Sequence, residues 1–477
     1  MNPSWCVLLV ASLCTICECK YGYVVWDGNK VTVKTSEYFA DIPDGYVARA
    51  TYSNEINSTG WAFLELHSSR DFSDEKQAYA AGYLEGFLTR DLIWMHWQNM
   101  LKGYCYNKTD VCGLIEEFVD KNEEYMSSMV ETNSNNSYCW INMLGDLDEL
   151  AFALSLPKSN PENRLFDEHC TGLVKLLPDH SNLYVSHVTW NSYQSMLRLH
   201  KMYVMYLHVL PGGKKIIPGY KMSLTSYPAF VQSHKITRQS TDDFYIISSG
   251  LTAGETTIGN SNRSLFEHVK PVGQILEYAR AMVANRLART GKQWVDIFSR
   301  HNSGTYNNQW TEHLTRTTYF PSYNIPYFPR IFNLSGGNVR TATFGDWFGY
   351  DTNPRAKILK QKQVTLCFSS MLDFTTDAIH GGWYAADTYQ CIYLLLAGTF
   401  PFRALGHRSH GATDAKITSA YLRGSYRFLA IASPTHNISR GIPPFRWSKF
   451  DMGPYLSHVG HPDEWMFPPI LHDWEWE

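Results

Sequence analysis

Hydrophobic and polar residues alternate along the first part of the chain, from residue 21 to residue 66. Aromatic and β-branched residues are frequent there, as in the runs Val31-Thr32-Val33 and Trp61-Ala62-Phe63-Leu64. A repeat of two residues places successive side chains on opposite faces of a strand, and these residue types favour strands. The pattern therefore predicts several β-strands over residues 21–66.

Beyond this region the hydrophobic repeat lengthens to three or four residues, which is the repeat of an α-helix. It predicts a helix that begins with Asp74 as its cap and runs to about residue 100. One face of this helix would carry Ala80, Leu84, Leu88, Leu92 and Met95. Further helices are predicted over residues 113–156, 192–205 and 275–288. The last of these would turn Ala279, Met282, Val283 and Leu287 inward and end before Gly291.

Two β-rich runs, residues 173–177 and 183–190, flank the polar segment 178–182, and this arrangement predicts a hairpin. Opposed residues of an antiparallel hairpin have positions with a constant sum, which places Cys170 roughly opposite Trp190 and near His187. His187 and Trp190 are three residues apart, so a regular strand would turn them to opposite faces. A bulge or a strand end is needed for both to face the thiol. Residues 242–250 and 254–260 are each predicted to form a strand that ends in a turn.

The chain has 477 residues, of which 44% are hydrophobic and 14% aromatic. This is enough for one large or two ordinary domains. The formal net charge is −3, and the 18% of residues that are charged are mixed in sign. Neither nucleic-acid binding nor a basic membrane-binding segment is expected.

The N-terminus carries an apolar run, residues 5–17, that is too short to span a bilayer. It predicts a signal peptide over residues 1–19, with cleavage before Lys20. No later segment approaches the length of a transmembrane helix. We therefore expect a protein of the secretory pathway, either secreted or lysosomal.

Six glycosylation sequons agree with this route. They begin at Asn57, Asn107, Asn135, Asn262, Asn333 and Asn437. Cys105 and Cys112 flank a short polar segment and are the best candidates for a disulfide in an oxidising compartment. The chain after residue 19 has no C-x-x-C pair, so we expect no zinc or other metal site. No cofactor is expected either.

Two segments carry a resemblance to a known family. They are His169-Cys170-Thr171-Gly172-Leu173-Val174-Lys175-Leu176-Leu177-Pro178 and His187-Val188-Thr189-Trp190-Asn191-Ser192-Tyr193. Both resemble the central motifs of the phospholipase B-like family, and so do residues 242–250, 254–260 and 303–310. The resemblance covers nearly all of the chain from about residue 60 to residue 465. That family is similar to N-terminal nucleophile hydrolases, which cut their own chain before the nucleophile.

The resemblance implies an α+β fold of four layers (αββα), in which two facing antiparallel sheets lie between helices. It also implies a cut of the His169–Cys170 bond. The hydrolase domain would then consist of an N-terminal chain, residues 20–169, and a C-terminal chain, residues 170–477. Cys170 would be the first residue of the second chain.

The thiol of Cys170 would act as the nucleophile, with its own α-amine as the nearby base. Such an amine has an ordinary pKa of about 7.7–8.0, so part of it is neutral at working pH. The other active-site positions implied by the resemblance are His187, Trp190, Thr257, Asn324 and Arg355. Asn324 and Thr257 suit donors to an oxyanion, Arg355 suits orientation of the new N-terminus or of substrate, and His187 could tune the thiolate.

Each of these residues has an ordinary structural alternative when taken singly. Cys170 would be a buried and inert thiol, Asn324 would stabilise a turn, and Arg355 would form an ion pair. The sequence also departs from the family pattern in two places. The chain is shorter than the pattern between residues 310 and 319, and it diverges over residues 373–399. The pairing of Cys139, Cys367 and Cys391 stays open.

Other hydrolase designs are not supported. The chain lacks a G-x-S-x-G nucleophile elbow, an H-E-x-x-H zinc helix and the local signature of papain-like cysteine proteases. The predicted function is hydrolysis of acyl bonds, with removal of fatty acids from phospholipids as the reaction that the family name implies. Two alternatives stay open: an amidase acting on lipid amides or peptides, and a non-catalytic secreted glycoprotein that binds lipid or a partner. The sequence does not set the oligomeric state.

Overall fold

The computed structural model describes a mixed α+β fold. The described residues are 20–28, 30–102, 104–105, 109–128, 150–151, 153–154, 170–210, 212–228, 244–305, 318–362, 409–434, 436, 438, 442–451 and 453–476. Several positions discussed above lie outside them. These are the predicted signal peptide, His169, Asn107, Asn135, Asn437, Cys139, Cys367, Cys391, residues 310–317 and residues 373–399.

The larger sheet has eight strands in the order β10-β9-β8-β7-β4-β3-β1-β2 across the described residues. All neighbouring strands are antiparallel except β4 and β7, which are parallel. The bounds are β1 (Lys20–Asp27), β2 (Lys30–Ser36), β3 (Ala48–Glu55), β4 (Trp61–Ser68), β7 (Arg198–Val204), β8 (Lys221–Ser226), β9 (Phe244–Ile247) and β10 (Thr252–Gly254). The strands predicted over residues 21–66 are therefore confirmed.

The second sheet is antiparallel and contains the predicted hairpin. Its order is β11-β5-β6-β12-β13-β16. The bounds are β5 (Thr171–Leu176), β6 (Leu183–Ser192), β11 (Tyr319–Ser322), β12 (His410–Ser419), β13 (Leu429–Ala432) and β16 (Ile470–Leu471). A short pair, β14 (Phe445–Arg446) and β15 (Glu464–Trp465), lies apart from both sheets.

Helices occupy both halves of the chain. The α-helices are α1 (Ile56–Thr59), α2 (Asp74–Leu88), α3 (Arg90–Met100), α4 (Thr109–Ser128), α6 (Glu277–Leu287), α7 (Gly291–Phe298), α9 (Pro329–Leu334), α10 (Gly337–Phe344), α11 (Pro354–Lys362) and α14 (Ala420–Gly424). Short 3-10 helices are η1 (Phe39–Asp41), η4 (Tyr193–Ser195), η5 (Arg263–His268), η6 (Asp346–Phe348), η13 (Trp447–Lys449) and η14 (Gly453–Tyr455). None of these helices is long and apolar enough to cross a bilayer.

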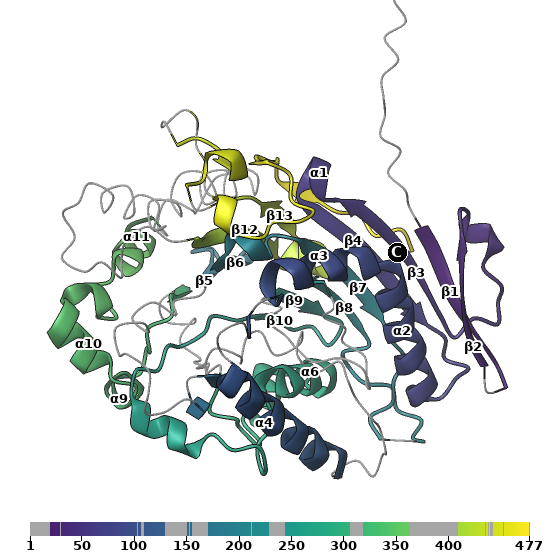
Figure 1. Cartoon of the computed structure of the whole chain (residues 1–477), viewed down its shortest axis with the longest axis horizontal. Helices are drawn as coiled ribbons and strands as arrows, with labels where there is room; N and C mark the ends of the chain where they lie inside the picture. The colour runs from purple at the N-terminus through teal and green to yellow at the C-terminus, as the bar shows by residue number, and fades with distance from the viewer. Residues whose placement is uncertain are drawn as a thin grey trace, which may run out of the picture.

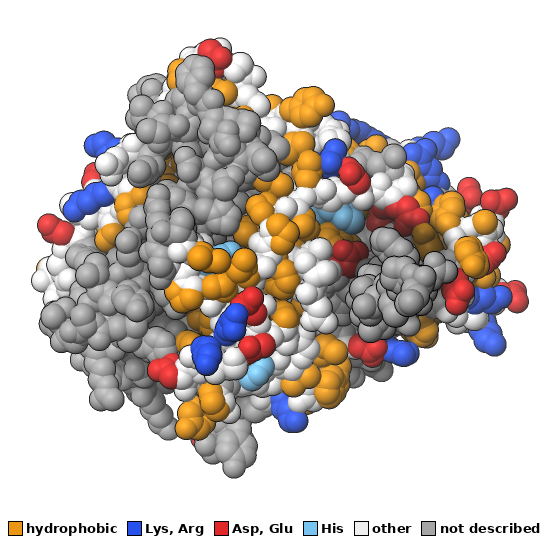
Figure 2. Space-filling view, turned by 90° about the horizontal axis from the view of Figure 1, so that it is seen from above, with side chains coloured by type: hydrophobic (Ala, Val, Ile, Leu, Met, Phe, Trp, Pro, Cys, Tyr) orange, Lys and Arg blue, Asp and Glu red, His pale blue; other side chains and the backbone are white. Residues whose placement is uncertain are grey.

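Helix α2 covers one face of the larger sheet, where it packs on β1, β3 and β4 (Figure 1). Gly22 of β1 makes this contact close, because a Cβ atom there would lie 2.9 Å from Cδ1 of Leu84 in α2. In Figure 1, β1 and β2 form the right-hand edge of the molecule, and α9, α10 and α11 lie on the opposite side. Hydrophobic side chains run through the middle of the face shown in Figure 2, among polar and charged ones.

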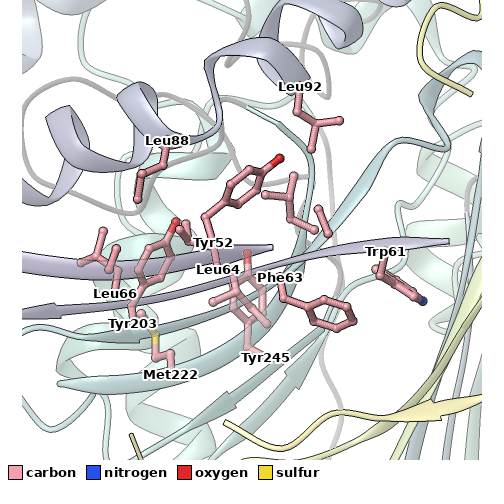
Figure 3. Packing of buried hydrophobic residues seen from close by; sticks show 14 of the residues in the cluster. Tyr52, Trp61, Phe63, Leu64, Leu66, Leu88, Leu92, Tyr203, Met222 and Tyr245 are labelled. Atoms are coloured by element: carbon pink, nitrogen blue, oxygen red, sulfur yellow. The ribbon is translucent and has the colours of Figure 1, made fainter. Parts of the chain in front are cut away.

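Strand β7 shows how the larger sheet is placed between α2 and the second sheet. Lys201 and Tyr203 both contact Glu85 of α2, at 2.9 Å from Nζ and 2.7 Å from the phenol oxygen. His200 points the other way, and its ring centroid is 4.0 Å from that of Phe428 beside β13. Since alternate residues of a strand face opposite sides, the two sheets lie face to face. Figure 3 shows Tyr52, Leu64, Leu66 and Tyr203 beneath α2. Trp61 and Phe63 of β4 lie on the other face of the sheet, beside His200.

A buried ionic cluster joins the two sheets. One carboxylate oxygen of Asp414 in β12 is 3.2 Å from Nη1 of Arg198 in β7. The other accepts bonds from Nζ of Lys416 at 2.5 Å and from Oγ1 of Thr189 in β6 at 3.0 Å. Burial raises the pKa of Asp414, but the charges of Arg198 and Lys416 lower it by more than burial raises it. The pKa therefore lies below its ordinary value. Asp414 therefore stays ionised and fixes β7 against β12 and β6.

The helix predicted over residues 74–100 is in fact two helices that meet at Thr89. Its backbone leaves the helical region (φ −98°, ψ 8°), and its hydroxyl donates to the carbonyl of Glu85 at 2.8 Å. The cap is Ser73, whose side chain accepts from the backbone N–H of Lys76, while Asp74 binds the ring of His208 at 2.8 Å. The predicted apolar face is confirmed, since its members are buried or pack against the core.

The helix predicted over residues 192–205 is wrong, because this stretch holds the end of β6, the short η4 helix and β7. Every residue of β7 is buried. A strand covered on both faces loses the alternating pattern, so its apolar spacing resembled that of a helix. Residues 255–260 likewise form no strand, since β10 ends at Gly254.

The helix predicted over residues 275–288 is present as α6, and its inward face was predicted only in part: Ala279 and Leu287 pack against buried clusters. Val283 is exposed, and the buried side includes Glu277, Arg280 and Arg286. The guanidinium of Arg280 is buried and donates to the carbonyls of Ile275 at 2.9 Å and Phe298 at 2.6 Å. Gly291 does not stop α6, which ends at Leu287; it begins α7. A helix was also predicted over residues 113–156. In the described part of this segment, α4 covers the residues up to 128, and residues 150–151 and 153–154 are helical.

Cys105 and Cys112 form the predicted disulfide, with a Cα–Cα distance of 5.9 Å. Of the sequon asparagines within the described residues, Asn57 and Asn333 are exposed. Asn262 is half-buried, and its side-chain nitrogen donates to the carbonyl of Leu334 at 2.8 Å. A glycan on Asn262 would take one of the two hydrogens of this nitrogen and leave one for a hydrogen bond.

We expect Asp414→Asn to lower the free energy of unfolding by about 3–5 kcal/mol, because it leaves Arg198 and Lys416 buried without their counter-charge. The pKa of Asp414 is lowered in the folded chain, so its stabilisation is present above the unfolded pKa of about 3.9. It is lost as pH falls through the lower folded value. The difference between the proteins should therefore be largest near neutral pH. Denaturant titration at several pH values measures it.

The matched control is Asp473→Asn. Asp473 pairs with Arg427 at 2.8 Å, but its side chain is 77% exposed. Exposed ion pairs contribute about 0–1 kcal/mol, so this variant should be nearly as stable as the wild type. Equal losses in the two variants would contradict the account of the inter-sheet cluster.

Candidate active site

Cys170 is the residue directly before β5. It is buried and is not disulfide-bonded. Its φ angle is 75°, in the left-handed region that residues with a Cβ atom rarely adopt. Such a conformation costs about 1–3 kcal/mol and persists only where surrounding contacts impose it. The chain is therefore bent at the residue whose thiol is the proposed nucleophile.

Arg355, in the first turn of α11, supplies those contacts. Its Nη1 donates to the carbonyl oxygen of Cys170 at 3.0 Å, to Oδ1 of Asn324 at 3.0 Å and to Oγ1 of Thr171 at 3.2 Å. Its Nη2 donates to the carbonyl oxygen of Tyr323 at 2.7 Å. A planar guanidinium with several donors is suited to such a junction, which a lysine could not reproduce. One side chain thus connects α11, the start of β5 and the turn after β11.

Trp190 also contacts Arg355. The guanidinium carbon is 5.1 Å from the centre of the Trp190 ring, within the range of a cation–π contact. Thr171 pairs with Val188, so the face of the hairpin that Thr171 shares with Arg355 is also the face of Trp190. His187 pairs with Gly172 and faces the other side. The irregularity in the pairing of β6 with β12 lies on β12, between Ala412 and Asp414. It therefore does not turn His187 and Trp190 of β6 to the same face.

Asn324 is held in one orientation by its neighbours. Its Oδ1 accepts from Arg355, and its Nδ2 donates to the carbonyl oxygen of Thr257 at 2.8 Å. Its φ angle of 69° is also left-handed, although asparagine tolerates this region better than most residues. An amide nitrogen has two hydrogens, so it can donate to a second acceptor besides Thr257. Asn324 is therefore a neutral donor whose position is fixed by the fold.

The segment after β10 links Asn324 to His187. Oγ1 of Thr257 donates to a carboxylate oxygen of Glu255 at 3.2 Å, and the carbonyl oxygen of Glu255 is 2.6 Å from Nε2 of His187. Thr256 also hydrogen-bonds Ser322 of β11. The contacts form a continuous chain from Cys170 through Arg355, Asn324, Thr257 and Glu255 to His187.

The contact with Glu255 fixes the tautomer of His187. A carbonyl oxygen only accepts, so Nε2 carries the hydrogen and the other nitrogen, Nδ1, is bare in the neutral ring. The pKa of His187 lies well below its ordinary value because the ring is buried, with the charges of Lys416 and Arg198 adding to the effect. Nδ1 is buried and makes no hydrogen bond within the described part of the chain. His187 is therefore a neutral ring with an unused acceptor.

Hydrogen bonds and one cation–π contact thus connect the six positions named from the sequence, although His187 faces the other side of the hairpin from Trp190. Each of the six is at most 6% exposed. Sequence reasoning missed Glu255, Thr171 and Tyr323, which act through a side chain or a backbone carbonyl. It also missed Asp414 and Lys416. These two are charged, two residues apart and on one face of a strand that is buried at every position after its first. Such charges in a strand are a signal that could have been used. No cluster of metal-binding side chains occurs within the described ranges.

Comparison with known proteins agrees with the motifs in the sequence. The profile of the family described as "Phospholipase B" matches residues 48–143, 136–311 and 310–472. The chain is 36% identical to "Putative phospholipase B-like 2" of Homo sapiens, over 91% of this chain and 86% of the human protein. It is 32% identical to a Caenorhabditis elegans protein of the same name, over 90% and 86%. It is 29% identical to "Phospholipase B-like protein B" of Dictyostelium discoideum, over 95% and 87%.

We expect the ring of His187 to stay neutral, with hydrogen on Nε2, at pH values well below 6.5. Burial and the charge of Lys416 both disfavour the imidazolium. Long-range proton–nitrogen NMR of protein labelled with nitrogen-15 histidine reports the state of both ring nitrogens, and His187→Gln assigns the signal. Protonation of His187 near pH 6.5, the ordinary value, would contradict the proposed tautomer.

Proposed function

Because the chain belongs to the phospholipase B family, we propose that it hydrolyses acyl bonds of lipids with Cys170 as an N-terminal nucleophile. The observation that carries the proposal is the hydrogen bond from Arg355 to the carbonyl of Cys170. It ties the thiol-bearing residue to a buried network that also contains Asn324, Thr257 and His187. A nucleophile, a neutral donor and an unprotonated ring are the components of acyl transfer.

The first proposed step is a cut of the chain before Cys170. The thiol attacks the carbonyl carbon of His169, the bond to the Cys170 nitrogen breaks, and that nitrogen takes up the thiol proton. Water then hydrolyses the resulting thioester, which leaves a carboxylate on residue 169 and a new α-amine on Cys170. The left-handed φ of Cys170 supports this step, because the strained torsion adjoins the bond to be broken.

In turnover the new α-amine acts as the base. It takes the proton of the Cys170 thiol as sulfur attacks the ester carbonyl, and it returns a proton to the departing alcohol. Water then attacks the S-acyl intermediate and releases the fatty acid. An α-amine is suited to both transfers, because its ordinary pKa of about 7.7–8.0 lies near working pH.

The remaining residues hold this reaction in place. Asn324 donates its side-chain amide to the oxyanion that forms on the attacked carbonyl, a contribution that typically exceeds 100-fold in rate. Arg355 is a positioning residue, since it fixes both the Cys170 backbone and the Asn324 side chain. His187 offers Nδ1 as an acceptor for a hydrogen of the α-amine or of substrate.

Two further features belong to the same proposal. The fold is that of a four-layer αββα hydrolase, which is supported by the two facing sheets and by α2 on the outer side of one of them. The protein enters the secretory pathway and is secreted or lysosomal. The disulfide, the exposed sequons at Asn57 and Asn333, and the apolar run at residues 5–17 support that location.

The decisive variant is Cys170→Ala, which removes the nucleophile and little volume. We expect the wild-type chain, purified from a secreting host, to run as two pieces on a reducing gel, with the second beginning at Cys170. The alanine variant should stay whole and release no fatty acid, because neither step has a nucleophile. N-terminal sequencing and assay of fatty-acid release measure the two outcomes. Thr171→Val is a control at the neighbouring residue: it removes a hydroxyl that accepts from Arg355 but keeps the thiol, so the chain should still be cut.

A comparison of two substrates distinguishes a phospholipase from an amidase and from a non-catalytic binding glycoprotein. A phospholipid and a lipid amide with the same acyl chain are offered to the cut protein, since the S-acyl step is open to both bond types. Faster release from the phospholipid supports the proposal, and faster release from the amide makes the protein an amidase. A wild-type chain that stays whole at both neutral and acidic pH, and releases nothing from either substrate, contradicts the enzymatic reading and favours a binding glycoprotein.

A further inference from the structure

A cavity of about 420 Å³ lies away from the candidate active site, between the segment 207–218 and the helices α6 and α7. None of the six candidate active-site residues lines it. Its volume falls within the range of small-molecule sites, about 300–1,000 Å³. The cavity and the charges around it are not used by the proposed reaction.

The fold closes one wall of the cavity tightly. The segment folds back on itself through a bridge between His208 and Ile216, and the N–H of Gly219 then donates to the carbonyl of Arg286 at 2.9 Å. A Cβ atom at Gly219 would lie 2.3 Å from the carbonyl oxygen of Asn285, so only glycine allows this approach. The segment is therefore held against the end of α6, and the cavity between them is part of the fold.

The lining combines an apolar floor with a positively charged rim. Val209, Leu287 and Ile297 supply half-buried apolar side chains from three different elements. Lys215 and Arg289 stand at the rim with exposed side chains. Arg300 adds a third exposed cation just beyond α7.

The rim carries an excess of positive charge. Among the described residues that line the cavity, the only carboxylate is that of Asp296, which already receives Nζ of Lys292 at 2.8 Å. Lys215, Arg289 and Arg300 form no ion pair within the part of the chain that the structure describes. Three like charges around one opening repel one another, so an anion placed between them is favoured.

We propose that this cavity binds a single-chain amphiphile with a carboxylate head, of the fatty-acid class. The carboxylate would lie among Lys215, Arg289 and Arg300, and the alkyl chain would cover Val209, Leu287 and Ile297. The limited volume favours one chain of moderate length over a two-chain lipid. The inference does not rest on the proposed hydrolysis, although a fatty acid is also the product of that reaction.

The test is calorimetric titration of the full-length protein with decanoate. The cavity variant carries Lys215→Gln, Arg289→Gln and Arg300→Gln. The matched control carries Lys30→Gln, Lys34→Gln and Lys449→Gln, which remove the same charge from exposed positions elsewhere. Three further probes are titrated into the wild type: decanol, which has the chain without the charge, acetate, which has the head without the chain, and inorganic phosphate.

We expect decanoate to bind the wild type and the control equally, and to bind the cavity variant about tenfold more weakly, since each exposed ion pair contributes modestly. Decanol and acetate should bind at least tenfold more weakly than decanoate. Undiminished binding by the cavity variant overturns the inference, as does acetate or phosphate binding as tightly as decanoate, which would indicate a simple anion patch. Neither outcome bears on the proposed hydrolysis, because no substituted residue belongs to the candidate active site.

Discussion

The site depends on one buried cation. The guanidinium of Arg355 binds the backbone of Cys170, the side chain of Asn324 and the carbonyl of Tyr323, and it lies over the ring of Trp190. Arg355 and Cys170 are 185 residues apart along the chain. A cation taken out of water is costly unless its donors are used, so the guanidinium imposes the positions of the groups that satisfy it. The left-handed conformations of Cys170 and Asn324 are two consequences, because both residues are held by it.

A second set of charges acts on the opposite face of the hairpin. Asp414 joins the two sheets through its ion pair with Arg198, and it also pairs with Lys416 in its own strand. The charges of Arg198 and Lys416 help to keep His187 neutral. The cluster that joins the sheets therefore also contributes, after burial, to the lowered pKa of His187. Asp414 is ionised and His187 is neutral because the surroundings of each shift its pKa in a different way.

Much of this arrangement could be predicted from the sequence, and the failures have physical causes. The hairpin was predictable because its strands are separated by a clear polar break and β5 begins directly after Cys170. Strand β7 was mistaken for a helix because burial on both faces removes alternation. The inward face of α6 was partly mistaken because Arg280 and Arg286 are buried, and their interior partners Phe298 and Met205 are distant in sequence. Glu255 was missed because it acts partly through its carbonyl, which the identity of a residue does not reveal.

The most direct measurement of the central claim is stoichiometric labelling of the cut protein with iodoacetamide, followed in parallel by peptide mass spectrometry and by assay of fatty-acid release. If Cys170 is the N-terminal nucleophile, one label should appear on the peptide that begins with Cys170 and has an unblocked α-amine. Hydrolysis should fall in proportion to that label. Undiminished hydrolysis by protein whose Cys170 is fully alkylated would contradict the account.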